Sequence, residues 1–313
     1  MNNSFIIFQK LLVLFGFMFI GYFSYKRKWI TDHTESQLSG LVVNIFNPAL
    51  IISGVISSST NGNLKMVIMD LFLAMLLFAI LIVISPLFVR ILRVKKSEIN
   101  IYSVMMIFSN LGFMGIPLIE ELYGKGAIFY VVIYSFVYTV VFYSYGIYLF
   151  EKEKAVQTGE KAKIQFEWKK MVNPGIIASL IAMLIFILQI KVPAPAVSFV
   201  DYLGNTCIPL SMILTGVSVA KLSIIEVFKD VKMYTFTFLK MLVIPVIAAV
   251  LIKKFHIDPM LSGIMVIMFA MPNGSMPVMM SIDYGIDSSV CSRGIVLTTL
   301  LSIITLPIIA YLI

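Results

Sequence analysis

Two stretches of the sequence place prolines, glycines and an asparagine inside long apolar runs. The first is Ser109–Pro117 (SNLGFMGIP) and the second is Ala270–Pro277 (AMPNGSMP). Proline lacks an amide hydrogen and clashes with the preceding helical turn, and glycine favours a helix only weakly. Each stretch is therefore expected to break a helix. In hydrocarbon the freed backbone groups cost several kcal/mol each, unless they are buried in protein or line a wet cavity.

Together the two stretches predict one polar site, in which two broken helices meet near the membrane midplane. Exposed carbonyl groups and half-helix N-termini would line it. A pair of ordinary proline kinks is the alternative, and the matching positions of the two motifs disfavour it. The residues assigned to this substrate and crossover site are Asn110, Gly112, Gly115, Pro117, Pro272, Asn273, Gly274 and Pro277.

Prolines also occur in the expected second and seventh spans, at Asn47-Pro48 and at Pro209. They are predicted to break these helices as well. A hinge or packing role is favoured over direct contact with substrate.

Two charged residues are candidates for charge coupling. Lys240 lies about eight residues into the expected eighth span, roughly 12 Å along the helix axis. It either pairs with a carboxylate, from substrate or from an internal acid, or reaches back to the headgroups. Asp283 follows the second motif and either binds a proton or a cation or simply ends its span. The sequence leaves both alternatives open.

Several chemistries are not expected. The sequence has no G-x-x-x-x-G-K-[ST] motif, so ATP hydrolysis by that route is excluded. His33 and His256 are isolated loop residues, and no metal-ligand spacing occurs. We therefore expect no catalytic residue, no metal site and no cofactor. Transport would be a uniport, or be driven by a gradient of protons or sodium ions.

The elements that must position these residues are membrane helices. Of the 313 residues, 60% are hydrophobic and 13% charged, about half the charged fraction of a soluble domain. Several apolar runs reach the ~20 residues that cross a bilayer. The basic residues cluster in short loops between these runs, so membrane topology explains the pI near 9.3 without a nucleic-acid partner. The two cysteines imply no disulfide framework.

Ten spans are expected, at residues 5–25, 36–58, 66–92, 99–121, 127–150, 174–190, 198–220, 232–252, 259–282 and 289–312. The first apolar run is too long for a signal peptide and is interpreted as a retained helix. Loops after odd-numbered spans, counted together with Arg90, Lys232 and Arg293 at the adjoining span ends, hold 17 basic residues. Loops after even-numbered spans hold 5. The positive-inside rule then places both termini outside and the hydrophilic segment 151–172 in the cytoplasm.

A weak internal repeat relates the two halves of the chain. Four landmarks recur at offsets of 161, 159, 160 and 161 residues: Pro48 and Pro209, Pro86 and Pro245, Pro117 and Pro277, and Tyr123-Gly124 and Tyr284-Gly285. Five spans in each half make the repeat inverted, as in many secondary transporters. The predicted organisation is a first repeat at 1–150, a cytoplasmic linker at 151–172 and a second, inverted repeat at 173–313. Asn110 and Asn273 are not at equivalent positions, so the site is expected to be only pseudo-symmetric.

At these motifs the sequence resembles the auxin efflux carrier family, in its short bacterial branch. The stretch from Asn110 to Pro117 is similar to the family's fourth-helix motif, and that from Ala270 to Pro277 to its ninth-helix motif. The resemblance implies an all-α fold of ten spans with broken, crossing helices 4 and 9. It further implies a static scaffold of spans 1, 2, 6 and 7. Spans 3–5 and 8–10 would then move as an elevator.

The resulting hypothesis is a secondary carrier for a small organic anion, in the cell membrane. By the resemblance, bacterial members are associated with malate, malonate and similar carboxylates. The short central linker disfavours auxin itself. Two alternatives remain: a sodium-coupled symporter of the bile-acid type, and a membrane sensor that binds ligand without moving it. The sequence decides neither the coupling ion nor whether the protein forms a homodimer.

Overall fold

The computed structural model describes residues 3–56, 64–159, 174–221 and 229–313. Within these ranges every named element is a helix, and the β-type pairing there is an isolated antiparallel bridge between Ser109 and Asn273. The chain divides into two compact units. Unit 1 comprises Met1–Phe72, Leu111–Phe136 and Val172–Lys221; unit 2 comprises Leu73–Asn110, Val137–Met171 and Leu222–Ile313.

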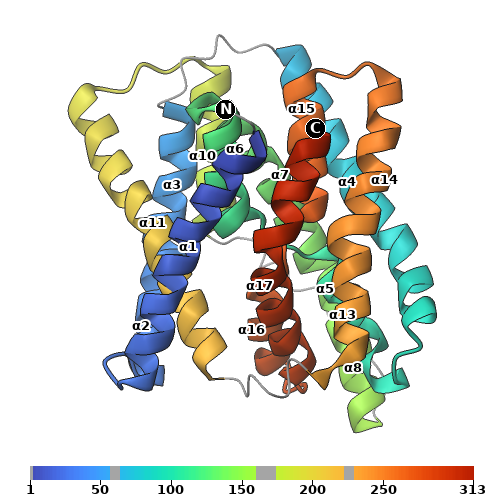
Figure 1. Cartoon of the computed structure of the whole chain (residues 1–313). Coiled ribbons are helices and arrows are strands. Elements are labelled where there is room, and N and C mark those ends of the chain that lie inside the picture. The colour runs from blue at the N-terminus through green and yellow to red at the C-terminus, as the bar shows by residue number, and fades with distance from the viewer. Residues whose placement is uncertain (1–2, 57–63, 160–173, 222–228) are drawn as a thin grey trace. The chain divides into compact units, whose positions relative to one another are not determined.

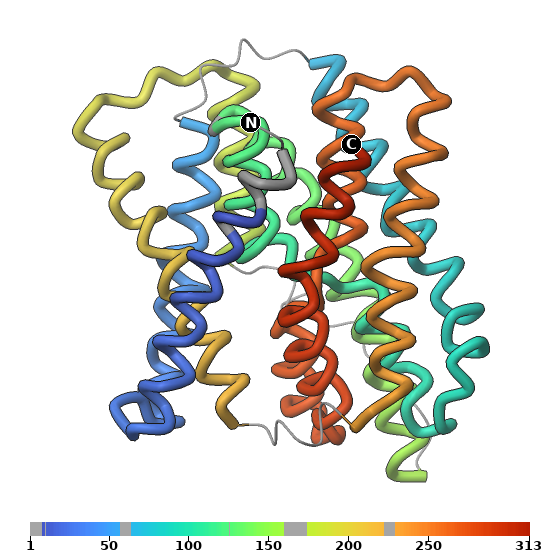
Figure 2. The backbone as a smooth tube through the Cα atoms, viewed as in Figure 1, coloured from blue at the N-terminus to red at the C-terminus, as the bar shows by residue number. Residues whose placement is uncertain are grey.

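Unit 1 is organised around two long helices, α1 (Asn3–Lys26) and α11 (Ala194–Ala220), which lie side by side (Figures 1 and 2). Their backbones approach closely, because a Cβ atom on Gly21 would lie 1.9 Å from the carbonyl oxygen of Ile213. Small residues permit such contacts between membrane helices. The other elements of unit 1 are α2 (Asp32–Leu41), η1 (Val42–Phe46), α3 (Asn47–Ile56), η3 (Leu111–Gly115), α6 (Ile116–Tyr123), η4 (Lys125–Ala127), α10 (Pro174–Ile187) and the first part of α7 (Ile128–Val141).

Unit 2 contains most of α4 (Leu64–Leu92), followed by η2 (Lys96–Glu98), α5 (Ile99–Ile107), the end of α7, η5 (Phe142–Gly146), α8 (Ile147–Thr158), α13 (Val231–Phe238), η6 (Leu239–Val243), α14 (Ile244–Ile252), η7 (Lys253–Phe255), α15 (Pro259–Ala270), α16 (Met276–Asp283) and α17 (Ser289–Leu312). Two short helices form its interior. Every residue of α5 from Asn100 onward is buried, and so is every residue of α15 from Gly263 onward. A helix that is apolar all round belongs in a core, so both motifs begin in the interior of this unit.

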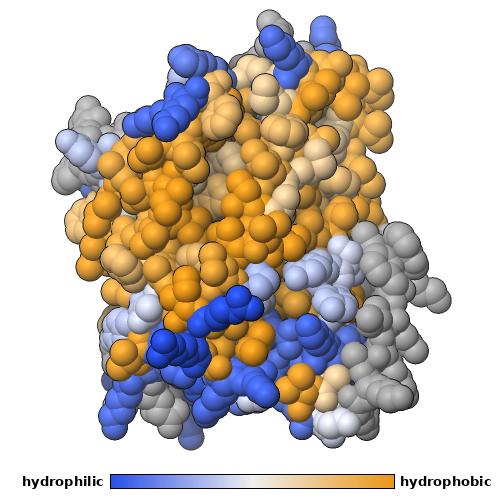
Figure 3. Space-filling model, turned by 90° about the vertical axis from the view of Figure 1, so that its right-hand side faces the viewer, coloured by the Kyte–Doolittle hydropathy of each residue, from blue (hydrophilic) through white to orange (hydrophobic). Residues whose placement is uncertain are grey.

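The surface of unit 2 carries many large apolar side chains. On α4 Val83 is 75% exposed, and on α14 Val250 is 58% exposed. In Figure 3 apolar residues form a broad band, and hydrophilic residues lie towards its ends. Soluble monomers rarely expose patches of this size, so this surface suits contact with lipid.

The helix lengths agree with a multi-pass membrane protein. Among the described residues six helices are long and apolar enough to cross a bilayer: Asp32–Ile56, Leu64–Leu92, Ile128–Thr158, Ala194–Ala220, Val231–Phe255 and Ser289–Leu312. Three shorter apolar helices are Leu11–Lys26, Pro174–Ile187 and Pro259–Ala270. The all-helical class is thus confirmed. The count of ten spans is not confirmed, and the inverted repeat stays a prediction.

Two expectations about local structure need correction. Pro209 lies inside α11, which continues without a break. Helix also continues from Asp32 to Ile56 through Pro48, after a π-helical turn at η1. The predicted breaks at these prolines are therefore wrong, because membrane helices absorb single prolines by local adjustment; their hinge role stays a prediction. The linker at 151–172 stays a prediction: α8 extends to Thr158, and residues 160–172 lie outside the described residues.

Candidate functional site

Both motifs interrupt a helix, in different ways. Helix α15 ends at Ala270, and helix resumes only at Met276. Met271 is extended, with ψ 140°, as expected for a residue that precedes a proline. Helix α5 ends at Ile107, before the glycines and Pro117 of its motif, and Phe108 is extended. Pro117 lies in α6, which continues directly from the π-helical turn η3, so this proline does not interrupt the helix. The break in the second motif is therefore where the sequence predicts it, and the break in the first lies at the start of its motif.

The two breaks pair with each other inside unit 2. The amide nitrogen of Asn110 donates to the carbonyl oxygen of Pro272 at 2.8 Å, and Ser109 and Asn273 form the isolated bridge. A Cβ atom on Gly274 would lie 3.4 Å from the Ser109 carbonyl oxygen. Backbone groups that two broken helices leave free thus satisfy one another, which meets the demand for internal pairing in a membrane.

Lys240 contributes its ammonium group to this crossing. Its side chain is 1% exposed, and it lies in η6, a π-helical stretch of the kind that often marks functional positions. The Nζ atom donates to the carbonyl oxygen of Met105 at 2.5 Å and to the side-chain oxygen of Asn273. The salt bridges found in the described part of the chain do not involve Lys240. Among the described residues Lys240 therefore has no acidic partner at the crossing.

The contact with Lys240 orients the Asn273 side chain. Because the lysine nitrogen acts as a donor, the amide oxygen must face it, and the amide nitrogen must point away. The Asn273 backbone nitrogen donates to the Thr298 hydroxyl at 3.0 Å, which itself donates to the Gly294 carbonyl at 2.7 Å. Among the described residues the Asn273 Nδ2 atom has no hydrogen-bond partner, although Asn273 is only 1% exposed. A buried donor without a partner costs about 1–3 kcal/mol, so Nδ2 suits an acceptor group on a ligand.

The structure brings together only some of the predicted site residues. Asn110, Pro272, Asn273, Gly274 and Lys240 meet at the crossing in unit 2. Pro277 is buried in the first turn of α16, in the same unit. By contrast, Gly112, Gly115 and Pro117 belong to unit 1. Asp283 is the last residue of α16 and is exposed, away from the crossing.

Sequence reasoning missed two buried acids. Asp70 in α4 is 0% exposed, and within the described chain neither of its carboxylate oxygens has a hydrogen-bond partner. The equally buried Tyr134 hydroxyl interacts with it electrostatically. In unit 2 Glu153 is also 0% exposed, but it accepts hydrogen bonds from Asn100 Nδ2 at 2.9 Å and from Gln157 at 3.1 Å. For Asp70 the available signal was its position inside the expected span 66–92, where an acidic residue is functional by default. Glu153 gave no such signal, because it lies in the predicted linker 151–172.

A charged cluster in unit 1 links the end of α11 to α2. The Lys221 ammonium lies 2.6 Å from a carboxylate oxygen of Asp32 and pairs with Glu35. The Ser218 hydroxyl donates to Glu35 at 3.2 Å. Partial burial alone would lower the pKa of Lys221, but the hydrogen bonds to both carboxylates outweigh it and raise the pKa. This cluster fastens α2 to α11 and is separate from the crossing residues.

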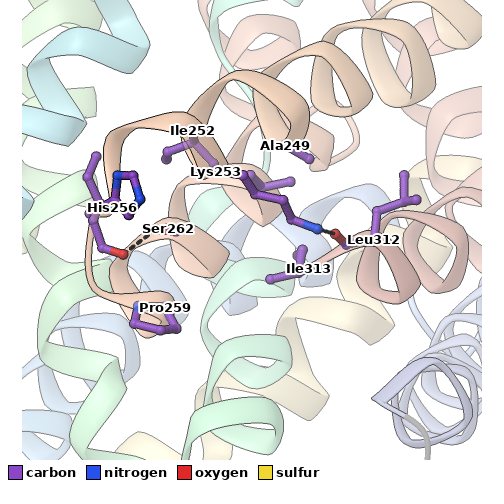
Figure 4. Close-up of a pocket in the computed structure, with 10 residues that line it drawn as sticks. Ala249, Ile252, Lys253, His256, Pro259, Ser262, Leu312 and Ile313 are labelled. Atoms are coloured by element: carbon purple, nitrogen blue, oxygen red, sulfur yellow. Dashed lines mark hydrogen bonds between the residues drawn. The ribbon is translucent and has the colours of Figure 1, made fainter.

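A cavity of about 200 Å³ opens between the α14–α15 connection and the end of α17 (Figure 4). In it the Lys253 ammonium donates to the carbonyl oxygen of Leu312 at 2.6 Å. Its lining is mostly apolar, and none of the crossing residues takes part: Ala249, Ile252, Lys253, His256, Ile257, Pro259, Ser262, Val266, Leu312 and Ile313. The crossing, which combines a charge with an unpaired donor, is the better candidate for a functional site.

Interrupted helices around a buried polar centre are typical of membrane transporters. Comparison of sequences agrees with this class. The family described as membrane transport protein matches residues 6–310, so the chain belongs to this family, that of the auxin efflux carriers. An uncharacterized transporter from Methanothermobacter thermautotrophicus is 21% identical over 300 residues, which cover 96% of each chain. Members of the family are transporters and not enzymes.

Proposed function

We propose that the protein is a secondary carrier that moves a small organic anion, a carboxylate such as malate or malonate, by alternating access. One observation carries the proposal. At the crossing the buried Asn273 Nδ2 donor, unpaired among the described residues, lies on a side chain that also contacts the Lys240 ammonium. A carboxylate is the simplest group that would accept from this donor and offset the charge.

Electrostatics favour an anion over a cation or a neutral solute. A lysine inside the membrane-spanning part of a protein is costly unless an opposite charge accompanies it. In the described part of the chain Lys240 forms no ion pair. A bound carboxylate would provide the missing charge, whereas a cationic substrate would be repelled. The crossing would then alternate between a loaded state, with the anion bound, and an empty state, after the anion is released.

The composition of the two units supports an elevator-like mechanism. Helices α1, α2, α3, α10 and α11 belong to unit 1, and α5, α8 and α13–α17 belong to unit 2. This division follows in part the scaffold and transport domains that the family resemblance implies. It differs at η3, α6 and the first part of α7, which the resemblance assigns to the transport domain and which belong to unit 1. The crossing lies wholly in unit 2, so a movement of that unit would carry a bound substrate with it. Domain movements of this kind are common in carriers whose site lies near the midplane.

Uptake into proteoliposomes tests the function. Purified protein would be reconstituted, and uptake of labelled malate and malonate measured with and without a pH gradient, in sodium or choline buffer. We expect saturable uptake of at least one anion. If correctly folded protein takes up neither, the proposed substrate is wrong. Flux in this one-component system also excludes a sensor, and a strict requirement for sodium would favour the bile-acid-type alternative.

Alanine variants locate the site. Replacement of Asn273 removes both the Lys240 contact and the unpaired donor, so binding should weaken strongly. Asn110→Ala removes a buried amide from the same crossing. Substrate binding that survives both changes unaltered would show that the crossing is not the site.

We also propose that both termini lie outside the cell membrane and that segment 151–172 is cytoplasmic, because the basic residues favour this orientation. Labelling of single introduced cysteines by an impermeant reagent in intact cells would test it. Both native cysteines, Cys207 and Cys291, are buried, so their background should be low. Labelling at position 154 in intact cells, without labelling near the C-terminus, would contradict the orientation.

A further inference from the structure

The Lys240 ammonium lies where two interrupted helices end. Met105 is in the last turn of α5, which stops at Ile107. The last carbonyl groups of a helix have no intrahelical partner and carry its partial negative charge. The Lys240 ammonium donates to the Met105 carbonyl oxygen and to the Asn273 side-chain oxygen. Asn273 belongs to the break between α15 and α16. Two oxygen atoms from two different breaks thus converge on one positively charged nitrogen.

Oxygen atoms of this kind coordinate monovalent cations in many transporters. Carbonyl groups of unwound segments and the C-terminal ends of half-helices are the ligands that coordinate coupling ions in secondary carriers. Here the same kinds of group, the Met105 carbonyl and the Asn273 amide oxygen, bind Nζ of Lys240. The Phe236 ring lies 5.9 Å from Nζ, and an aromatic face also favours a desolvated cation.

We infer that Lys240 is a tethered cation, held by the Met105 and Asn273 oxygens in the place where the crossing would otherwise bind a monovalent metal ion. A metal ion and an ammonium group cannot share these two ligands, because like charges a few ångströms apart in a poorly solvated site repel strongly. The tethered charge is present without any ion from solution. The wild-type crossing therefore needs no sodium ion to assemble.

The inference rests on the proposed function only where it concerns coupling, since it disfavours the sodium-coupled alternative. The site itself can be tested without any substrate. Removal of the side chain beyond Cβ in Lys240→Ala leaves both oxygens in place without their cation. A small cation from solution should then enter, and a ligand that binds only the folded state raises its stability in proportion to the logarithm of concentration.

The experiment measures the melting temperature of purified protein in detergent, in sodium, lithium or choline chloride at equal ionic strength. For wild type we expect the same melting temperature in all three salts. For Lys240→Ala we expect a lower value in choline, and a rise of several degrees with sodium or lithium that grows with the logarithm of the salt concentration. Lys240→Met is the matched control. Its uncharged side chain still fills the space, so it should respond to none of the salts.

Two results would overturn the inference. One is a sodium-specific rise for wild type, which would mean that a metal ion binds despite Lys240. The other is a folded Lys240→Ala variant that melts at one temperature in all salts. If the alanine variant cannot be obtained folded, the wild-type comparison decides alone. If the wild-type protein transports neither malate nor malonate but shows this pattern of melting temperatures, the proposed substrate is wrong and the inference about Lys240 is supported.

Discussion

The Nζ atom of Lys240 donates to the side-chain oxygen of Asn273, and this contact turns the amide nitrogen of Asn273 towards Gly294. One residue therefore joins the fixed charge of η6 to the break between α15 and α16. The amide nitrogen is the donor that the proposed substrate would use. The orientation is testable, because an aspartate has the shape of asparagine but can only accept.

Asn273→Asp should separate stability from binding. The carboxylate would keep the contact with Lys240 and strengthen it, since hydrogen bonds between charged groups contribute about 1.5–3 kcal/mol. We expect a melting temperature equal to or above that of wild type. The second carboxylate oxygen would replace the Nδ2 donor and repel an anion, so stabilisation by malate or malonate should disappear. A variant that still binds these anions with wild-type affinity would contradict the orientation.

Gly294→Ala should disturb the same donor from the opposite side. A Cβ atom at this position would lie 2.5 Å from the Met105 sulfur and 2.9 Å from Asn273 Nδ2. The flexible methionine can move away, but the amide is held by Lys240 and must shift. We expect anion affinity to fall about tenfold, equivalent to ~1.4 kcal/mol, in a thermal-shift titration. Gly40→Ala in α2 is the control, because its Cβ meets nothing within 4 Å. Equal affinities of both variants would count against a donor at Nδ2.

Local sequence signals predicted the break in the motif Ala270–Pro277 but placed the break in Ser109–Pro117 less well. Pro272 favours an extended conformation at Met271, and the dipeptide Met271-Pro272 is therefore enough to predict this break. No such residue stands at Phe108–Asn110. There the helix ends where the Asn110 amide donates a hydrogen bond to the Pro272 carbonyl, which lies far away in the sequence. The prolines at 48 and 209 mislead in the opposite sense, since a proline by itself does not end a membrane helix.

The central contact of the site could not be read from the sequence. Lys240 was a candidate, but its partner lies 33 residues away and is brought near only by tertiary packing. Hydropathy left a headgroup contact equally open. Asp70 could have been identified, because an acid within an apolar run is a signal in itself. Whether such an acid has partners, as Glu153 does, depends on neighbouring helices that composition does not reveal.

The two buried acids should respond differently to neutral substitutions. Glu153 accepts from two amide donors, so Glu153→Gln would place an amide group against them and lower the stability by about 1–3 kcal/mol. Asp70 lacks hydrogen-bond partners in the described chain. Asp70→Asn therefore removes the cost of a buried carboxyl group without hydrogen bonds, and it should keep or raise the melting temperature. Each variant serves as the control for the other. A larger loss of stability for Asp70→Asn than for Glu153→Gln would show that Asp70 has a strong partner.

Replacement of Gly21 or Gly216 by alanine should disrupt the packing of α1 against α11. A Cβ atom on Gly21 would lie 1.9 Å from the Ile213 carbonyl oxygen, and one on Gly216 would lie 1.9 Å from that of Met18. Backbone atoms cannot yield as a side chain can, so each alanine variant should lose about 1–3 kcal/mol of stability. Gly16→Ala, on the same helix but with nothing within 4 Å of its Cβ, should be neutral or slightly stabilising. If Gly21→Ala melts like Gly16→Ala in detergent, the two helices are not packed this closely.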